Sequence, residues 1–214
     1  MENQPNDHGF PAHDVVYKAM RSRVMYGEIA PGVAITIRGI ADEFDVSMTP
    51  VREALRRLVA EGALSMSTSG RVRTPELSND RIEELASLRA LIEVELAARA
   101  LPRAHPALIE RLTTLNNAIS VAVAQADAVS YIRQNLEFHR TLYLRAQAPA
   151  MLAMLETVWL QLGPTMRTLY GKMRGSDPPR NHRLILAALR AGDEPGLRVA
   201  VRADVTQGLR MLAR

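Results

Sequence analysis

The chain lacks several features, and each absence excludes a class of protein. None of its 214 residues is cysteine, which rules out disulfides and thiolate metal sites. Aromatic residues make up only 4% of the sequence, a composition that favours helices over sheets. No apolar run approaches the roughly 18 residues of a membrane span, and the polar stretch MENQPNDHGF lacks the apolar region of a signal peptide. We therefore expect a cytoplasmic, mostly helical protein with no membrane partner.

The charge of the chain does not by itself locate an interface. The formal net charge is +4, which is compatible with an acidic partner. Residues 1–76 nevertheless hold nine basic and ten acidic side chains, a net charge of −1, so the remaining residues carry +5. Only the positions of individual arginines can therefore indicate where a polyanion would bind.

The first third of the sequence predicts three short helices followed by a hairpin. Apolar spacing predicts helices at 14–26, 36–44 and 49–61, separated by the breaker GEIAPG and the tight turn DVS. Alternating residues on both sides of STSG then predict a small β-hairpin with basic residues near its tip. This order of elements is that of a winged helix-turn-helix, in which the helix after the turn enters the major groove of DNA.

The stretch VSMTPVREALRRL, residues 46–58, carries the expected recognition helix. Thr49 is suited to cap this helix, and Pro50 fits its first position. One apolar stripe at helical spacing consists of Val51, Ala54, Leu55, Leu58 and Val59. Arg52 and Arg56 are four residues apart and lie on another face. They are candidates for DNA contact, and the alternative is a solvated arginine face without function.

The segment IADEFDVSMTPVREALRRLVAEGAL, together with the hairpin glycine, resembles the DNA-binding domain of the GntR family of bacterial transcription regulators. The resemblance covers about residues 12–75 and implies contacts with bases, phosphates or the DNA backbone. Met48 stands where many members have arginine, which implies a different operator preference. The predicted DNA-binding residues, including the arginine from the helix face, are Arg38, Ser47, Thr49, Arg52, Arg56, Gly70 and Arg71.

The remainder of the sequence predicts helices only. After the linker PELSND, apolar spacing and border prolines predict helices at about 80–101, 106–125, 128–146, 149–172, 178–191 and 194–213. Asp80 and Glu83 are the predicted capping box of the first of these. The expected fold is mostly α, with a winged helix-turn-helix at 1–76 and an all-helical bundle of about six helices at 77–214.

Polar residues interrupt the apolar stripes of four of these helices. They are Arg89, the pair Asn135 and His139, then His182, and finally Asp204. A polar group that faces a core is costly unless it meets a partner or a ligand. Each residue alone is most simply a satisfied core residue, but interruptions on four different helices predict that these side chains surround one cavity.

Three segments resemble the FCD effector domain of the FadR subfamily: LRALIEVELAARAL, NLEFHRTLYLRAQAPAML and NHRLILAAL. The resemblance spans about residues 80–212, and six helices suit the VanR-like branch. Many members bind a divalent metal through one aspartate and three histidines. Here His139 and His182 match, Asn135 stands at the aspartate position, and Asp204 stands at the last histidine position. The resemblance thus implies a Zn²⁺, Ni²⁺ or Mn²⁺ site at these four residues, with Arg89 holding an effector carboxylate.

The leading prediction is a ligand-responsive transcription regulator, such as a repressor, that binds a palindromic operator as a homodimer. One alternative is a metal-dependent hydrolytic enzyme in which His139, His182 and Asp204 activate water. However, the sequence contains no nucleophile elbow or phosphate loop, and an enzyme does not require a winged helix. A second alternative is a DNA-binding protein that responds to no ligand. Within the leading prediction, a metal-free polar pocket for an anionic metabolite also stays open.

Overall fold

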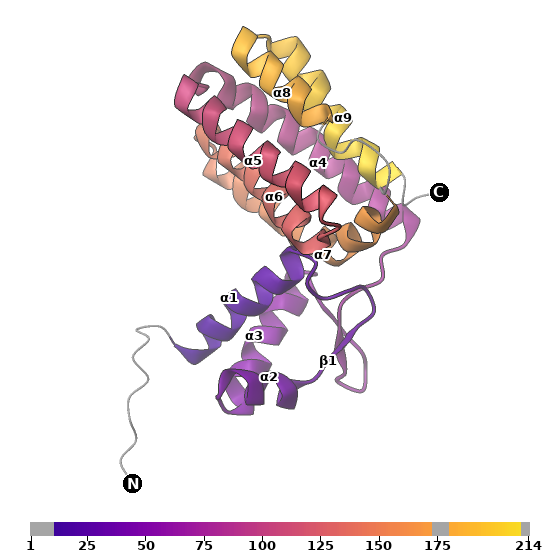
Figure 1. Ribbon diagram of the computed structural model, residues 1–214. Coiled ribbons are helices and arrows are strands. Elements are labelled where there is room, and N and C mark those ends of the chain that lie inside the picture. Colours follow the sequence, from indigo (N-terminus) through magenta and orange to yellow (C-terminus); the bar gives the residue numbers. More distant parts are fainter. Residues whose placement is uncertain (1–10, 173–179, 211–214) are drawn as a thin grey trace.

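The structure is a computed structural model and describes residues 11–172 and 180–210. Figure 1 shows a small N-terminal domain below an elongated bundle of long helices. The end of the first helix touches the bundle, and the second helix lies at the far side of the small domain. Within the described ranges, no helix is both long enough and apolar enough to cross a membrane.

The N-terminal domain contains the three predicted helices and the predicted hairpin. Its elements are α1 (Ala12–Met25), β1 (Ala34–Ile35), α2 (Ile37–Phe44), α3 (Met48–Ala60), β2 (Ser65–Met66) and β3 (Val72–Arg73). The strands form an antiparallel sheet in the order β1-β3-β2. The sequence did not predict β1, because a two-residue strand is too short to show an alternating pattern.

Local interactions define both ends of α2, and the second of them forms the tight turn before α3. The hydroxyl of Thr36 accepts a hydrogen bond from the backbone N–H of Gly39 at 3.2 Å and caps the start of the helix. At the other end, Asp45 adopts the left-handed conformation with φ 51°. Aspartate tolerates this conformation better than most residues do. The chain therefore reverses within a few residues and presents α3 beside α2.

Several predicted helix starts are wrong by one or two residues, including that of α1, which begins at Ala12 and not at residue 14, and those of α3 and α4 (Asn79–Ala100). Helix α3 begins at Met48, so Thr49 lies inside the first turn instead of capping it. Helix α4 begins at Asn79, because the Ser78 hydroxyl accepts the backbone N–H of Arg81 at 3.3 Å. In both cases a serine occupies the N-cap position and the predicted cap residue falls within the helix.

The C-terminal domain contains the six predicted helices. They are α4 (Asn79–Ala100), α5 (Pro106–Ala124), α6 (Ala128–Tyr143), α7 (Pro149–Lys172), α8 (Arg180–Ala191) and α9 (Glu194–Arg210). Short 3-10 turns follow two of them, η1 (Leu101–Arg103) and η2 (Leu144–Ala146). The ends of two predicted helices, residues 178–179 and 211–213, lie outside the described residues. Helix α4 packs against α6, α7 and α9, so polar groups on these helices can meet in the interior of the bundle.

Helix α7 joins the bundle to the DNA-binding domain. A β-carbon at Gly163 would overlap the backbone carbonyl oxygen of Val24, so only glycine lets α1 and α7 approach this closely. Two residues earlier, the Gln161 side chain donates to the carbonyl of Glu61 at 3.1 Å, directly after α3. Arg81 donates to the same glutamine at 2.8 Å. The C-terminal end of the recognition helix is therefore tied to both α7 and α4.

Candidate functional site

The structure exposes all the residues predicted to contact DNA. They belong to α2, to the start and outer face of α3, and to the hairpin tip. These exposed residues are Arg38, Ser47, Thr49, Arg52, Arg56, Gly70 and Arg71. Their exposure leaves these basic groups and the start of α3 accessible to a partner.

The arginines on this face differ from a neighbouring arginine that supports the fold. Among the described residues, no acidic side chain forms an ion pair with Arg38, Arg52, Arg56 or Arg71. Arg57 instead lies 3.5 Å from Asp14 and stacks over the ring of Tyr17 at 3.7 Å. Arg57 thus holds α3 against α1, while the outer arginines keep their charge available for a polyanion.

The recognition helix and the wing share a hollow of about 200 Å³. Arg52, Arg56 and Gly70 line it, above an apolar floor that includes Leu55 and Val72. Gly70 turns the hairpin with φ 78°, a left-handed conformation that glycine adopts without steric cost. The structure therefore brings three of the predicted residues together. Among the other predicted residues, Arg38, Ser47, Thr49 and Arg71 do not line this hollow.

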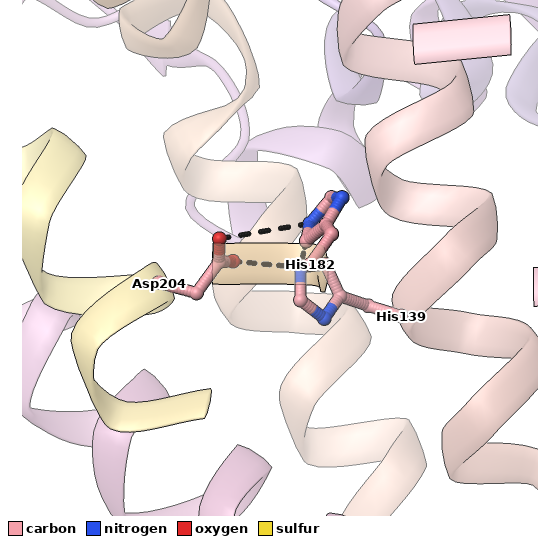
Figure 2. Close-up of side chains that lie close together, drawn as sticks. All are labelled: His139, His182 and Asp204. Carbon is pink, nitrogen blue, oxygen red and sulfur yellow. Dashed lines mark hydrogen bonds and ion pairs between the residues drawn. The ribbon is translucent and has the colours of Figure 1, made fainter. Parts of the chain in front are cut away.

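A second cluster lies inside the helical bundle, where His139, His182 and Asp204 meet from α6, α8 and α9 (Figure 2). His139 Nε2 lies 3.0 Å from Asp204 Oδ2 and 3.3 Å from His182 Nε2. His182 Nε2 lies 3.6 Å from Asp204 Oδ1. One ligand atom of each residue lies within 4.8 Å of the others. The structure thus assembles three of the four predicted metal ligands around one point.

The electrostatics of the cluster keep its carboxylate ionised. Burial alone would raise the pKa of Asp204, but the charge of His182 and the hydrogen bond to His139 hold it well below its usual range. The His182 ring stacks on Phe138 with centroids 4.1 Å apart, and its Nδ1 is buried without a hydrogen-bond partner among the described residues. The imidazoles are thus oriented by packing and directed at an ionised carboxylate.

The sequence did not predict a role for Glu93, which is fully buried beside this cluster. It accepts hydrogen bonds from Arg89 Nε at 2.5 Å, from Tyr143 Oη at 2.9 Å and from Trp159 Nε1 at 3.0 Å. Burial tends to lower the pKa of Arg89, but the charge of Glu93 raises it above its ordinary value. The sequence feature that could have indicated this ion pair is the spacing of Arg89 and Glu93, which are four residues apart on α4.

Two predicted site residues are buried near the cluster, and their roles stay predictions. Asn135 lies one turn before His139 on α6. Arg89 already donates its Nε to Glu93. An effector carboxylate would therefore have to approach the two terminal nitrogens of the guanidinium group.

The donor set fits a divalent metal ion. Two imidazole nitrogens and one carboxylate oxygen converge from three helices, and the carboxylate supplies a negative charge. Such nitrogen and oxygen ligands suit Zn²⁺, Ni²⁺ and Mn²⁺ and do not favour soft Cu(I). The same groups, with Arg89 beside them, can bind and orient a small anion.

Two protein families match parts of the chain. The description "Bacterial regulatory proteins, gntR family" matches residues 12–73, and "FCD domain" matches residues 84–207. The HTH-type transcriptional regulator McbR of Escherichia coli (strain K12) is 28% identical over 196 residues, covering 90% of this chain and 89% of McbR. The gluconate operon transcriptional repressor of Bacillus subtilis (strain 168) is 30% identical over 149 residues, covering 70% of this chain and 59% of the repressor.

Solved structures show the same architecture along the whole chain. The E. coli McbR/YncC structure superposes with a TM-score of 0.86 at 27% identity, covering 95% of this chain and 97% of that one. A transcriptional regulator GntR from Rhodococcus sp. RHA1 shares the fold with a TM-score of 0.79 at 18% identity, covering 94% and 96%. These relatives are transcription regulators and not enzymes. The chain therefore belongs to the GntR family of bacterial transcription regulators and carries an FCD effector domain behind its winged helix-turn-helix.

Proposed function

We propose that this regulator binds a palindromic operator as a homodimer and changes its DNA affinity when a divalent metal and a small carboxylate occupy the buried cluster. The observation that carries the proposal is the convergence of His139, His182 and Asp204 in the domain tied to the recognition helix through α7. The DNA-binding domain would span residues 1–76, and the effector-binding and dimerisation domain residues 77–214. Such a regulator acts at the chromosome and therefore in the cytoplasm.

The charge of the cluster supports a metal together with an anionic effector. Histidines must be neutral to bind a metal, and in that state the single positive charge of Arg89 stands against the negative charges of Glu93 and Asp204, which leaves a net charge of −1. A buried site with that charge repels a carboxylate. A divalent ion held by His139, His182 and Asp204, with the Asn135 amide as a further neutral oxygen, changes the sign to +1. A metal-bound anion is therefore favoured over the metal-free anion pocket.

The proposed homodimer is supported by the small number of base pairs that one recognition helix contacts. A single recognition helix contacts only a few base pairs, too few for useful selectivity in a genome. A twofold dimer presents two such helices to two half-sites in inverted orientation. The helical domain would supply the contact between the two copies.

Ligand dependence separates this proposal from a DNA-binding protein that responds to no ligand. We expect Zn²⁺, alone or with a small carboxylate from a panel of metabolites, to change operator affinity by about 5–150-fold, the usual range of allosteric coupling. Fluorescence anisotropy on a duplex selected from random DNA by the wild-type protein measures this change. An affinity that stays constant across Zn²⁺, Ni²⁺, Mn²⁺ and the whole panel would favour the ligand-independent binder.

Two arginines of the DNA-binding face should behave differently when replaced. Arg52 is exposed on the outer face of α3 near its start, so Arg52→Ala should weaken binding to the preferred duplex by about 1–3 kcal/mol, the range of a lost base contact. Arg71 lies on the wing, where a phosphate contact is expected. Arg71→Ala should weaken binding to all sequences alike and lower the salt slope by about one. Anisotropy titrations on preferred and scrambled duplexes at several salt concentrations check both effects, and unchanged affinity of Arg52→Ala would rule out the groove assignment.

A further inference from the structure

Glu93 is bonded more extensively than an ion pair requires. Arg89, on the same helix, already neutralises its charge through Oε1. The other carboxylate oxygen, Oε2, instead meets the hydroxyl of Tyr143, which comes from α6. Trp159 of α7 completes the set of donors. One fully buried carboxylate therefore holds side chains of three helices, and one of these side chains touches the metal-site cluster.

The contact with the cluster runs through the Tyr143 hydroxyl. Its oxygen lies 2.9 Å from Glu93 Oε2 and 3.1 Å from His139 Nδ1. A tyrosine phenol ordinarily carries its proton at neutral pH. An ionised carboxylate can only accept hydrogen bonds, and the phenol has a single proton to donate. The hydroxyl must therefore donate to Glu93 and accept from an N–H at His139 Nδ1.

This order of hydrogen bonds fixes the tautomer of His139. A neutral imidazole carries one N–H, so a proton on Nδ1 leaves a lone pair on Nε2. Nε2 is the atom that lies 3.0 Å from Asp204 Oδ2 and 3.3 Å from His182 Nε2. Three contacts link Glu93 to Asp204: Glu93 to the Tyr143 hydroxyl, that hydroxyl to His139 Nδ1, and His139 Nε2 to Asp204. Each of them requires a proton or another positive centre between its two acceptor atoms. The phenol and the neutral imidazole supply two protons, and a metal ion held at Nε2 would supply the third positive centre.

We propose that Glu93 is a positioning residue of the metal site, which acts through Tyr143 to hold the His139 proton on Nδ1 and to present Nε2 to the ion. The inference rests on the proposed metal function. It adds buried side chains that orient a metal ligand without binding the ion themselves. Carboxylates that orient a metal-bound histidine are known to tune metal affinity by about 10–100-fold. Here the carboxylate would act through one intervening phenol.

Tyr143→Phe tests the proposal, because it removes the connecting hydroxyl and leaves the Arg89–Glu93 pair in place. We expect its affinity for Zn²⁺, measured by competition with a fluorescent chelator, to fall about 10–100-fold. Tyr170→Phe is the matched control, since it removes another buried phenol hydroxyl whose bond, at 3.4 Å, goes to the backbone of Ala122. The control should bind Zn²⁺ as the wild type does. Equal affinity of Tyr143→Phe and wild type would overturn the proposal.

A ¹⁵N NMR spectrum of histidine-labelled full-length protein reads the tautomer directly. We expect wild-type His139 to carry its proton on Nδ1 without added metal and to bind Zn²⁺ through Nε2. In Tyr143→Phe the proton should shift toward Nε2. A wild-type proton on Nε2, or Zn²⁺ bound through Nδ1, would refute the positioning role even if the variant did not fold. Wild-type protein with the Nδ1 tautomer but no affinity for Zn²⁺ would instead reject the proposed metal function and leave the orienting contact standing.

Discussion

Replacing Glu93 by alanine is expected to lower the free energy of unfolding by about 3–5 kcal/mol, the usual cost of leaving one partner of a buried ion pair without the other. The side chain is fully buried, and its removal strands the guanidinium group of Arg89 in the interior of the bundle. Trp159 Nε1 and the hydroxyl of Tyr143 lose their acceptor at the same time. Urea denaturation followed by circular dichroism measures the change in unfolding free energy.

Glu95→Ala is the matched control for that loss. Glu95 lies on the same helix and also pairs with an arginine four residues away, Arg99, at 2.8 Å, with a longer contact to Arg198 at 3.4 Å. This pair is exposed, so its loss should change the unfolding free energy by about 0–1 kcal/mol. If Glu93→Ala were no more destabilising than Glu95→Ala, the buried pair would not have the structural importance that its position indicates.

The second large effect is stabilisation of the folded protein by metal. A ligand that binds only the folded state at 100 times its Kd adds about 2.7 kcal/mol. For a chain of this size that corresponds to a rise in Tm of roughly 5–10 °C. The double variant His139→Ala with His182→Ala should lose the whole rise, because two of the three converging ligands are gone. Thermal unfolding with and without Zn²⁺, Ni²⁺ or Mn²⁺ measures the effect.

His13→Ala provides a control for metal bound at other histidines. His13 lies on α1, far along the chain from the cluster, and its side chain is 37% exposed. This variant should keep the full rise in Tm. Elemental analysis that finds no bound metal, combined with an unchanged wild-type Tm on adding each ion, would exclude the metal and leave only an anion pocket.

The helices could be predicted from the sequence because their apolar stripes are regular and their borders carry prolines. Helix α7 was predicted at 149–172, the range that the structure shows. The buried positions of His139, His182 and Asn135 could also be predicted, because each polar side chain interrupts an apolar face that packs against the bundle. Periodicity gives the direction in which a side chain points, and that direction was sufficient for these residues.

Glu93 could not be predicted in the same way. Glu93 follows Arg89 by four residues on α4, a spacing that exposed ion pairs such as Glu95–Arg99 also have, so the spacing alone does not show that the pair is buried. Its partner Trp159 is indistinguishable in sequence from an ordinary core aromatic residue, since only the bundle shows that its N–H meets a carboxylate. The contact of Gly163 with α1 likewise depends on how the two domains meet, which local patterns do not encode.

Selection of duplexes from random-sequence DNA by the purified full-length protein tests the central claim most directly. A homodimer that reads DNA through α3 should enrich an inverted repeat with two equivalent half-sites at one fixed spacing. Arg52→Ala should lose preference at the same positions of both half-sites, because the twofold axis places one copy of Arg52 at each. Enrichment of a single unpaired half-site would contradict the dimer, and enrichment of no sequence would contradict operator recognition by this winged helix-turn-helix.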